Sequence, residues 1–178
     1  MPSAEGNLTW TPLAEAGELL APPVAAAAAH VPNARVAKID PHVADTAAFC
    51  ETYDVAPEAS ANCVVVLGRR GDRETHAAVM VLATDKADIN KTVRKELDAR
   101  KVSFADQDDT EARTGMTSGG ITPIGLPEDW VILVDQAVVD AGPVVIGGGV
   151  RGSKILLDGA DLAALPGARV VPLALPRD

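Results

Sequence analysis

The chain has 178 residues and a net charge of −9, with 47% hydrophobic and only 3% aromatic residues. One globular domain with an aliphatic core fits this length and composition. The acidic balance argues against DNA as a partner, no apolar run is long enough for a membrane span, and the start lacks a signal-peptide pattern. Cys50 and Cys63 lie in a helix-like and a strand-like stretch, which indicates buried, reduced thiols and a cytoplasmic protein.

The first 33 residues differ in pattern from the rest, and we expect them to form an N-terminal extension. Pro22 and Pro23 precede five alanines, which predicts a break followed by a short helix that ends near His30. The extension is free to pack on the domain or on a second subunit, so a monomer and a homodimer both stay open. We expect the domain itself to span residues 34–178.

The rest of the chain mixes strands with short helices. The strongest local prediction is a β-hairpin, because β-branched runs over 63–67 and 75–82 flank the turn residues Gly71 and Asp72. Further strands are expected over residues 34–39, 102–105, 130–134, 144–146, 155–157 and 169–171. Helices are expected from Asp45, over 88–99, over 108–114 with Gly115 as a left-handed cap, and from Asp158 or Asp161. Without a regular βαβ repeat, this pattern predicts an α+β domain with a curved mixed sheet.

Basic residues are concentrated in one region of the chain. Six of them lie between Lys86 and Lys101, and a helix over 88–99 would place Lys91, Arg94 and Lys95 on one face. That face either contacts phosphates or is a solvated face offset by neighbouring carboxylates. Taken alone, the pattern favours the solvated face.

The sequence contains no HExxH, paired CxxC, GxSxG or Walker A motif, so we expect neither a metal ion nor a cofactor. What remains is two glycine-rich loops, 119–125 and 147–152, each next to a predicted buried strand. Glycine and Pro123 give such a loop a defined shape that presents backbone groups to a ligand, although many glycine loops only turn the chain. If the two strands are neighbours, both loops border one pocket near Asp135. The Asp135 carboxylate then either faces that pocket or is held by backbone donors.

The order of these features resembles the YbaK/prolyl-tRNA synthetase-associated domain family, whose members hydrolyse mischarged aminoacyl-tRNA. The resemblance runs from about residue 34 to residue 172 and leaves out the first thirty-odd residues. It is carried by Thr114-Gly115, by Gly119-Gly120-Ile121-Thr122-Pro123-Ile124-Gly125, by Asp135 and by Gly148-Gly149-Val150-Arg151-Gly152.

This resemblance implies an α+β fold around a mixed, curved, barrel-like sheet surrounded by helices, with a pocket for the aminoacyl group and the terminal adenosine of tRNA. It also implies a catalytic loop whose backbone binds the ester carbonyl and orients water. Backbone N–H groups aimed at a developing oxyanion make a large contribution to catalysis. The catalytic residues carried over are Gly119, Gly120, Ile121, Thr122 and Pro123. The expected substrate-binding residues are Gly125, Asp135, Gly148, Gly149 and Arg151, to which we add Lys91 from the basic face.

One position departs from the family pattern, which has Lys-Thr-Leu or Lys-Ser-Leu at the start of the central strand. The corresponding segment here is Ala61-Asn62-Cys63-Val64-Val65, so Asn62 stands where the lysine is expected. An amide offers a dipole in place of a full charge, and it can also accept a hydrogen bond. The candidates for supplying a charge from elsewhere are Lys91, Lys154 and Arg151.

Two functions therefore stay open. The first is a free-standing, trans-editing deacylase that cleaves the ester of mischarged tRNA, with the aminoacylated 3′ end of tRNA as its partner and Asn62 in the catalytic set. The second is a non-catalytic paralogue that binds an aminoacyl-like or nucleotide-like ligand, or a protein partner, without turnover.

Overall fold

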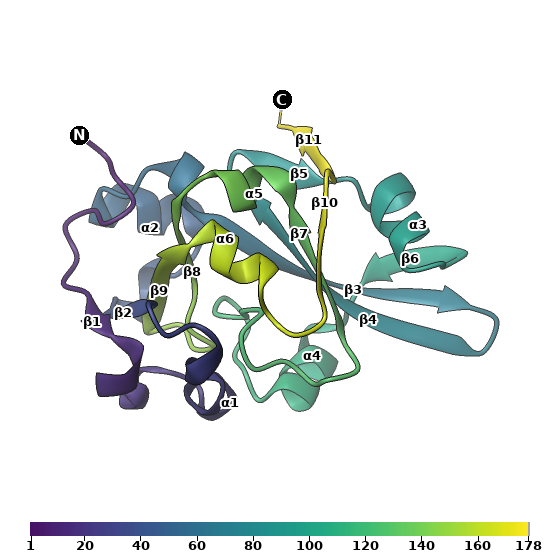
Figure 1. Cartoon of the computed structure of the whole chain (residues 1–178), viewed down its shortest axis with the longest axis horizontal. Helices are drawn as coiled ribbons and strands as arrows, with labels where there is room; N and C mark the ends of the chain where they lie inside the picture. Colours follow the sequence, from purple (N-terminus) through teal and green to yellow (C-terminus); the bar gives the residue numbers. More distant parts are fainter. Residues whose placement is uncertain (178) are drawn as a thin grey trace.

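The computed structural model describes residues 1–177 and shows an α+β domain in which short helices cover the sheets (Figure 1). The strands are β1 (Thr11–Pro12), β2 (Arg35–Lys38), β3 (Ala61–Arg70), β4 (Arg73–Leu82), β5 (Asp85–Ala87), β6 (Lys101–Phe104), β7 (Val131–Asp135), β8 (Pro143–Gly147), β9 (Ser153–Asp158), β10 (Ala168–Val171) and β11 (Ala174–Pro176). The α-helices are α1 (Pro22–Ala26), α2 (Thr46–Tyr53), α3 (Arg94–Glu96), α4 (Gln107–Thr114), α5 (Gln136–Asp140) and α6 (Gly159–Ala163). No helix within this part of the chain is long and apolar enough to cross a membrane.

A five-stranded mixed sheet, ordered β10-β7-β4-β3-β6, forms the centre of the fold. β3 is antiparallel to β4 and β6, whereas β7 is parallel to β4 and β10. A four-stranded antiparallel sheet, β1-β2-β9-β8, lies beside it, and a bridge between Ser60 and Val145 links the start of β3 to β8. The prediction of an α+β fold with a mixed sheet is confirmed. The sheets do not close into a barrel.

The predicted hairpin is confirmed and organises the central sheet. β3 and β4 pair without interruption from Ala61 opposite Leu82 to Arg70 opposite Arg73. Gly71 takes the left-handed conformation, with a φ of +60°, that this tight turn requires. In Figure 1 the hairpin runs from the side of α2 out to a free tip, which places the start of β3 next to α2.

Three apolar clusters fill the space between the sheets and helices. One face of the central sheet packs against the segment that contains α3, and the other face packs against the second sheet. A third cluster lies under α2 and includes Phe49, Val145 and Leu156. Burying a large apolar side chain of this kind stabilises a fold by about 1.5 to 3 kcal/mol.

The beginning of the chain contributes to the same core as the sheets. Leu13, Leu20, Val24 and Val31 are buried there, and β1 pairs with β2. The helical turns of this region end at His30, as the alanine-rich pattern predicts.

The predicted helix over 88–99 is correct in position but irregular. A π-helical turn over Ile89–Val93 leads into the short helix α3, and Val93 and Leu97 face the core as expected. α4 ends at a left-handed Gly115 with a φ of +71°, which confirms the predicted cap. β1, β5 and β11 were not predicted because strands of two or three residues are too short to show an alternating pattern.

Candidate functional site

The two glycine-rich loops contact each other directly. The N–H of Gly149 donates to the carbonyl of Gly120 at 2.7 Å, and the N–H of Thr117 donates to the carbonyl of Gly149 at 2.9 Å. A Cβ atom on Gly120 would collide with the backbone of Val150, and one on Gly147 would lie 2.5 Å from the carbonyl oxygen of Gly120. Glycine is needed at both positions because the two backbones approach so closely.

The start of the chain supports both loops from the opposite side. The N–H of Ala21 donates to the carbonyl of Gly148 at 3.2 Å, and a Cβ atom on Gly149 would lie 2.5 Å from the Cβ of Ala21. Gly125 packs against the backbone of Pro23 with no room for a side chain. The first turn of α1 and the residue before it therefore hold the loops in place.

A pocket of about 300 Å³ opens where the loops meet the start of β3 and the beginning of α2, and we name it the loop pocket. Its lining residues are Ala44, Asp45, Thr46, Ala61, Asn62, Cys63, Val64, Gly119, Ile121, Gly147 and Lys154. The pocket brings together three predicted residues, Gly119, Ile121 and Asn62, with the end of β8. Gly119 has a φ of +94°, a conformation that side chains other than glycine rarely adopt.

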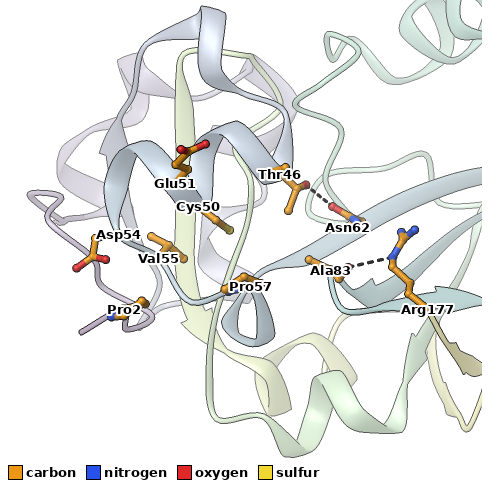
Figure 2. A pocket seen from close by; sticks show the side chains of 11 residues that line it. Pro2, Thr46, Cys50, Glu51, Asp54, Val55, Pro57, Asn62, Ala83 and Arg177 are labelled. Carbon is orange, nitrogen blue, oxygen red and sulfur yellow. Dashed lines mark hydrogen bonds between the residues drawn. The ribbon is translucent and has the colours of Figure 1, made fainter.

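Asn62 lines both the loop pocket and a larger cavity, and Figure 2 shows it among the residues of the larger cavity. The hydroxyl of Thr46 on α2 donates to Oδ1 of Asn62 at 2.6 Å, and both residues line both spaces. The larger cavity has a volume of about 570 Å³, and its walls include Cys50, Val55 and Pro57. Asn62 thus faces the loops, with its carbonyl oxygen engaged by Thr46 and its amide hydrogens free to donate.

Lys154 of β9 places a cation at the same pocket. It pairs across the sheet with Gly147, the residue at which the second loop begins. Its side chain is only 8% exposed, and Nζ lies 5.1 Å from the centre of the Phe49 ring, an attractive cation–π contact. Burial lowers the pKa of this ammonium below its ordinary value of 10.5, against a smaller opposing effect of Cys50.

The second half of the first loop points away from the loop pocket. Thr122 is completely buried, and its hydroxyl has no hydrogen-bond partner among the described residues. Pro123 and Gly125 line a separate cavity of about 440 Å³, beside Trp130. The predicted catalytic segment is therefore divided, since Gly119 and Ile121 reach the loop pocket whereas Thr122 and Pro123 do not line it.

Asp135 is buried and lines neither the loop pocket nor the cavity beside it. Oδ1 accepts from the N–H groups of Leu173 at 2.9 Å and Ala174 at 3.1 Å, and Oδ2 accepts from that of Ala137 at 3.2 Å. Of the two alternatives, this arrangement is the one in which backbone donors hold the carboxylate. The pocket expected near Asp135 lies elsewhere because β7 and β8 belong to different sheets.

The remaining predicted residues surround the pocket or lie far from it. Arg151 donates to the carbonyl oxygens of Pro41 at 3.2 Å and Ser118 at 3.4 Å, so its guanidinium braces the loops. Gly148 packs against Ser153, with no room for a Cβ atom. Lys91 is exposed on the π-helical turn and does not line the pocket.

Neither Lys154 nor Thr46 is in the predicted site, although Lys154 was one of three candidates for the missing charge. The signal for Lys154 was a lysine at the beginning of an otherwise apolar strand, one residue after Ser153. Thr46 gave no signal beyond its place after the helix cap. Within residues 1–177, no group of three or more histidine, cysteine or acidic side chains is arranged to hold a metal ion.

These features define the class of protein: a small α+β domain with a pocket where two mutually hydrogen-bonded glycine loops meet the start of β3 and the beginning of α2. The chain belongs to the family described as the aminoacyl-tRNA editing domain, whose family model matches residues 40–165, more than half of the chain. This match confirms the resemblance to the YbaK/prolyl-tRNA synthetase-associated domains.

Solved structures share the fold. A protein proposed to be a trans-editing enzyme for prolyl tRNA synthetase is 18% identical, with a TM-score of 0.69 over 80% of this chain and 87% of that one. The hypothetical protein APE2540 is 22% identical, with a TM-score of 0.70 over 80% and 92%. A protein from Marinobacter aquaeolei VT8, proposed to act in signal transduction, is 15% identical, with a TM-score of 0.56. That match covers 83% of this chain but 29% of the other. At these identities the likeness concerns the fold alone.

Proposed function

We propose that the chain is an aminoacyl-tRNA deacylase that acts in trans, binding the aminoacylated 3′ end of a mischarged tRNA and hydrolysing its ester. The observation that carries this proposal is the loop pocket, which brings Gly119 and Ile121 of the first glycine loop together with Asn62 in a chain of the editing-domain family. Fixed backbone donors next to the carbonyl would stabilise the oxyanion that forms when water attacks.

The size and division of the site support a substrate with two parts. The loop pocket and the larger cavity behind the Thr46–Asn62 bond are each within the usual range for small-ligand sites. The ester and aminoacyl group would occupy the loop pocket, and the terminal nucleoside of the tRNA would occupy the larger cavity. Only the 3′ end of the tRNA would enter such a site.

A panel of mischarged tRNAs tests the proposal. The purified chain should release the amino acid from at least one of them faster than buffer does, and no release from any would refute a deacylase. Gly119→Ala should reduce the rate, because a Cβ atom there would displace Arg151 and disturb the pocket wall. The matched control is Gly142→Ala, which changes a residue with a similar positive φ of +75° but with no atom within 4 Å of the added Cβ.

The second candidate is a binding protein that has lost turnover, and the specific observation that favours it is Asn62 at the family's lysine position. Such a protein would bind an aminoacyl-like or nucleotide-like ligand, or a protein partner. Asn62→Lys separates the two candidates. A strong gain of deacylation from an inactive wild-type chain would identify a lost enzyme, whereas a wild-type chain that is already active excludes the binding-only function.

Two further proposals follow from the same role. Translation editing takes place in the cytoplasm, and we propose that location for this chain. We also propose that residues 1–33 are an extension that braces an editing domain over residues 34–178, because the family match starts at residue 40 while earlier residues pack behind the loops.

A further inference from the structure

The Lys154 ammonium has no carboxylate partner among the residues that the structure describes. A lysine that is only 8% exposed usually pairs with an acidic group, because burying an ammonium alone is costly. The neighbouring groups that act on its charge are Cys50 from α2 and Asp45 at the start of that helix, which favour it, and Arg151 from the second loop, which opposes it. Nζ lies 5.1 Å from the centre of the Phe49 ring, a cation–π contact.

Lys154 lines the loop pocket, and its ammonium is not fully buried. Among residues 1–177, the fully buried polar side-chain atoms without a partner are His76 Nε2, Thr122 Oγ1 and Ser153 Oγ. Nζ of Lys154 is not one of them, although no hydrogen bond to it is found among the same residues, so its tip keeps some exposure in a residue that lines the loop pocket. A donor that is desolvated by its surroundings and unpaired at its tip can bind an oxygen of a ligand strongly.

The position of Lys154 in the sheet explains how it reaches the loops. It pairs with Gly147 across β8 and β9, and Gly147 in turn lies against the carbonyls of Gly120 and Ile121. Residues paired in an antiparallel sheet have Cα atoms about 4.5 to 5.5 Å apart. Lys154 is therefore one strand away from the first loop, and Asn62 lines the same pocket from β3.

We infer that Lys154 supplies the positive charge of the loop pocket and is a catalytic residue that binds the ester carbonyl oxygen as it becomes negative. This inference rests on the proposed deacylase function. It places the charge on β9 in this chain, in place of the lysine that the family pattern puts at position 62 on β3.

The chemistry needs only water and the ester. The oxygen of water forms a bond to the carbonyl carbon, and the π electron pair of the carbonyl moves onto its oxygen. Lys154 donates a hydrogen bond to that oxyanion and keeps its proton. When the carbonyl re-forms, the bond to the ribose oxygen breaks, and the ribose oxygen takes up the proton that water released, leaving free amino acid and uncharged tRNA.

Single-turnover deacylation by the full chain tests the inference on a tRNA that the wild type cleaves. Lys154→Met keeps most of the length of the side chain and removes its charged end. We expect a loss of about 100-fold or more in the rate at saturating enzyme, the usual effect of losing one oxyanion donor, with little change in affinity for uncharged tRNA. Lys154→Arg should retain part of the rate. Lys38→Met is the matched control, because Lys38 is exposed on the neighbouring strand β2.

A second measurement does not depend on activity. The ¹³Cε signal of Lys154, assigned by its absence in Lys154→Met, should shift when an amide-linked 3′-aminoacylamino-adenosine is added, while that of Lys38 stays fixed. An unchanged Lys154 signal at millimolar analogue overturns the inference, and so does an undiminished rate in Lys154→Met. If the wild type cleaves no ester, the deacylase proposal fails by itself, and the NMR titration still decides whether Lys154 binds the ligand.

Discussion

Gly147→Ala tests the site directly. Gly147 ends β8 and has no positive φ, so the effect of the substitution comes from the contacts of the added Cβ and not from backbone strain. The added Cβ would lie 2.5 Å from the carbonyl oxygen of Gly120 and 2.9 Å from that of Ile121. Such contacts would force the two backbones apart, and overpacking of this kind destabilises a fold by about 1 to 3 kcal/mol. Separation would also weaken the hydrogen bond from Gly149 to Gly120, which contributes about 1 kcal/mol. The expected loss in the free energy of unfolding is about 2 to 4 kcal/mol.

Thermal unfolding and deacylation, measured on the same preparations, check this reasoning. For a chain of this size, about 1 kcal/mol corresponds to roughly 2 to 4 °C in Tm, so Gly147→Ala should lower Tm by about 4 to 16 °C and should also slow deacylation. Gly152→Ala is the matched control in the same loop, because its Cβ would meet no atom closer than 3.8 Å. Equal Tm values and equal rates for the two variants would refute the claim that the loops touch at Gly147.

Three other substitutions separate structural from functional roles. Asp135→Ala should lower the free energy of unfolding by about 3 kcal/mol or more, since three backbone N–H groups lose a charged acceptor; urea unfolding measures this, and an unchanged midpoint would contradict it. Thr46→Val should leave Oδ1 of Asn62 without its donor and change the KM for deacylation about tenfold while costing about 1 kcal/mol in stability; an unaltered KM would show that this bond does not shape the site. Lys154 binds its proton more weakly in the folded than in the unfolded chain, so wild type should gain stability relative to Lys154→Met as pH rises toward 10.5. Urea midpoints of both proteins at neutral pH and at pH 10.5 test the sign, and a constant difference would contradict it.

Local patterns in the sequence were enough to predict the main elements. The β-branched runs on either side of Gly71 and Asp72 form the β3–β4 hairpin, and Gly115 caps α4 as its position suggests. These predictions succeed because turn chemistry and the alternation of side chains act within a few residues.

The arrangement of the site depends on contacts that local patterns do not encode. Sequence order placed Asp135 next to the second loop, but β7 and β8 lie in different sheets, so its carboxylate caps α5 and holds the chain after β10 instead. Lys154 and Asn62 are ninety-two positions apart in the numbering and line one pocket where the two sheets adjoin, at the Ser60–Val145 bridge. Sheet topology depends on pairing between distant segments, and it determines which side chains line the loop pocket.

The packing of Ala21 and Pro23 behind the two loops couples the start of the chain to ligand binding. Any ligand that favours the ordered loops also favours the docked form of this segment, by the linkage that relates binding to stability. A chain shortened to begin at residue 34 would lose affinity as well as core residues. Conversely, occupancy of the pocket should slow amide hydrogen exchange at Ala21 and Val24, neither of which lines it. Exchange at these two amides would thus report on a site they never touch.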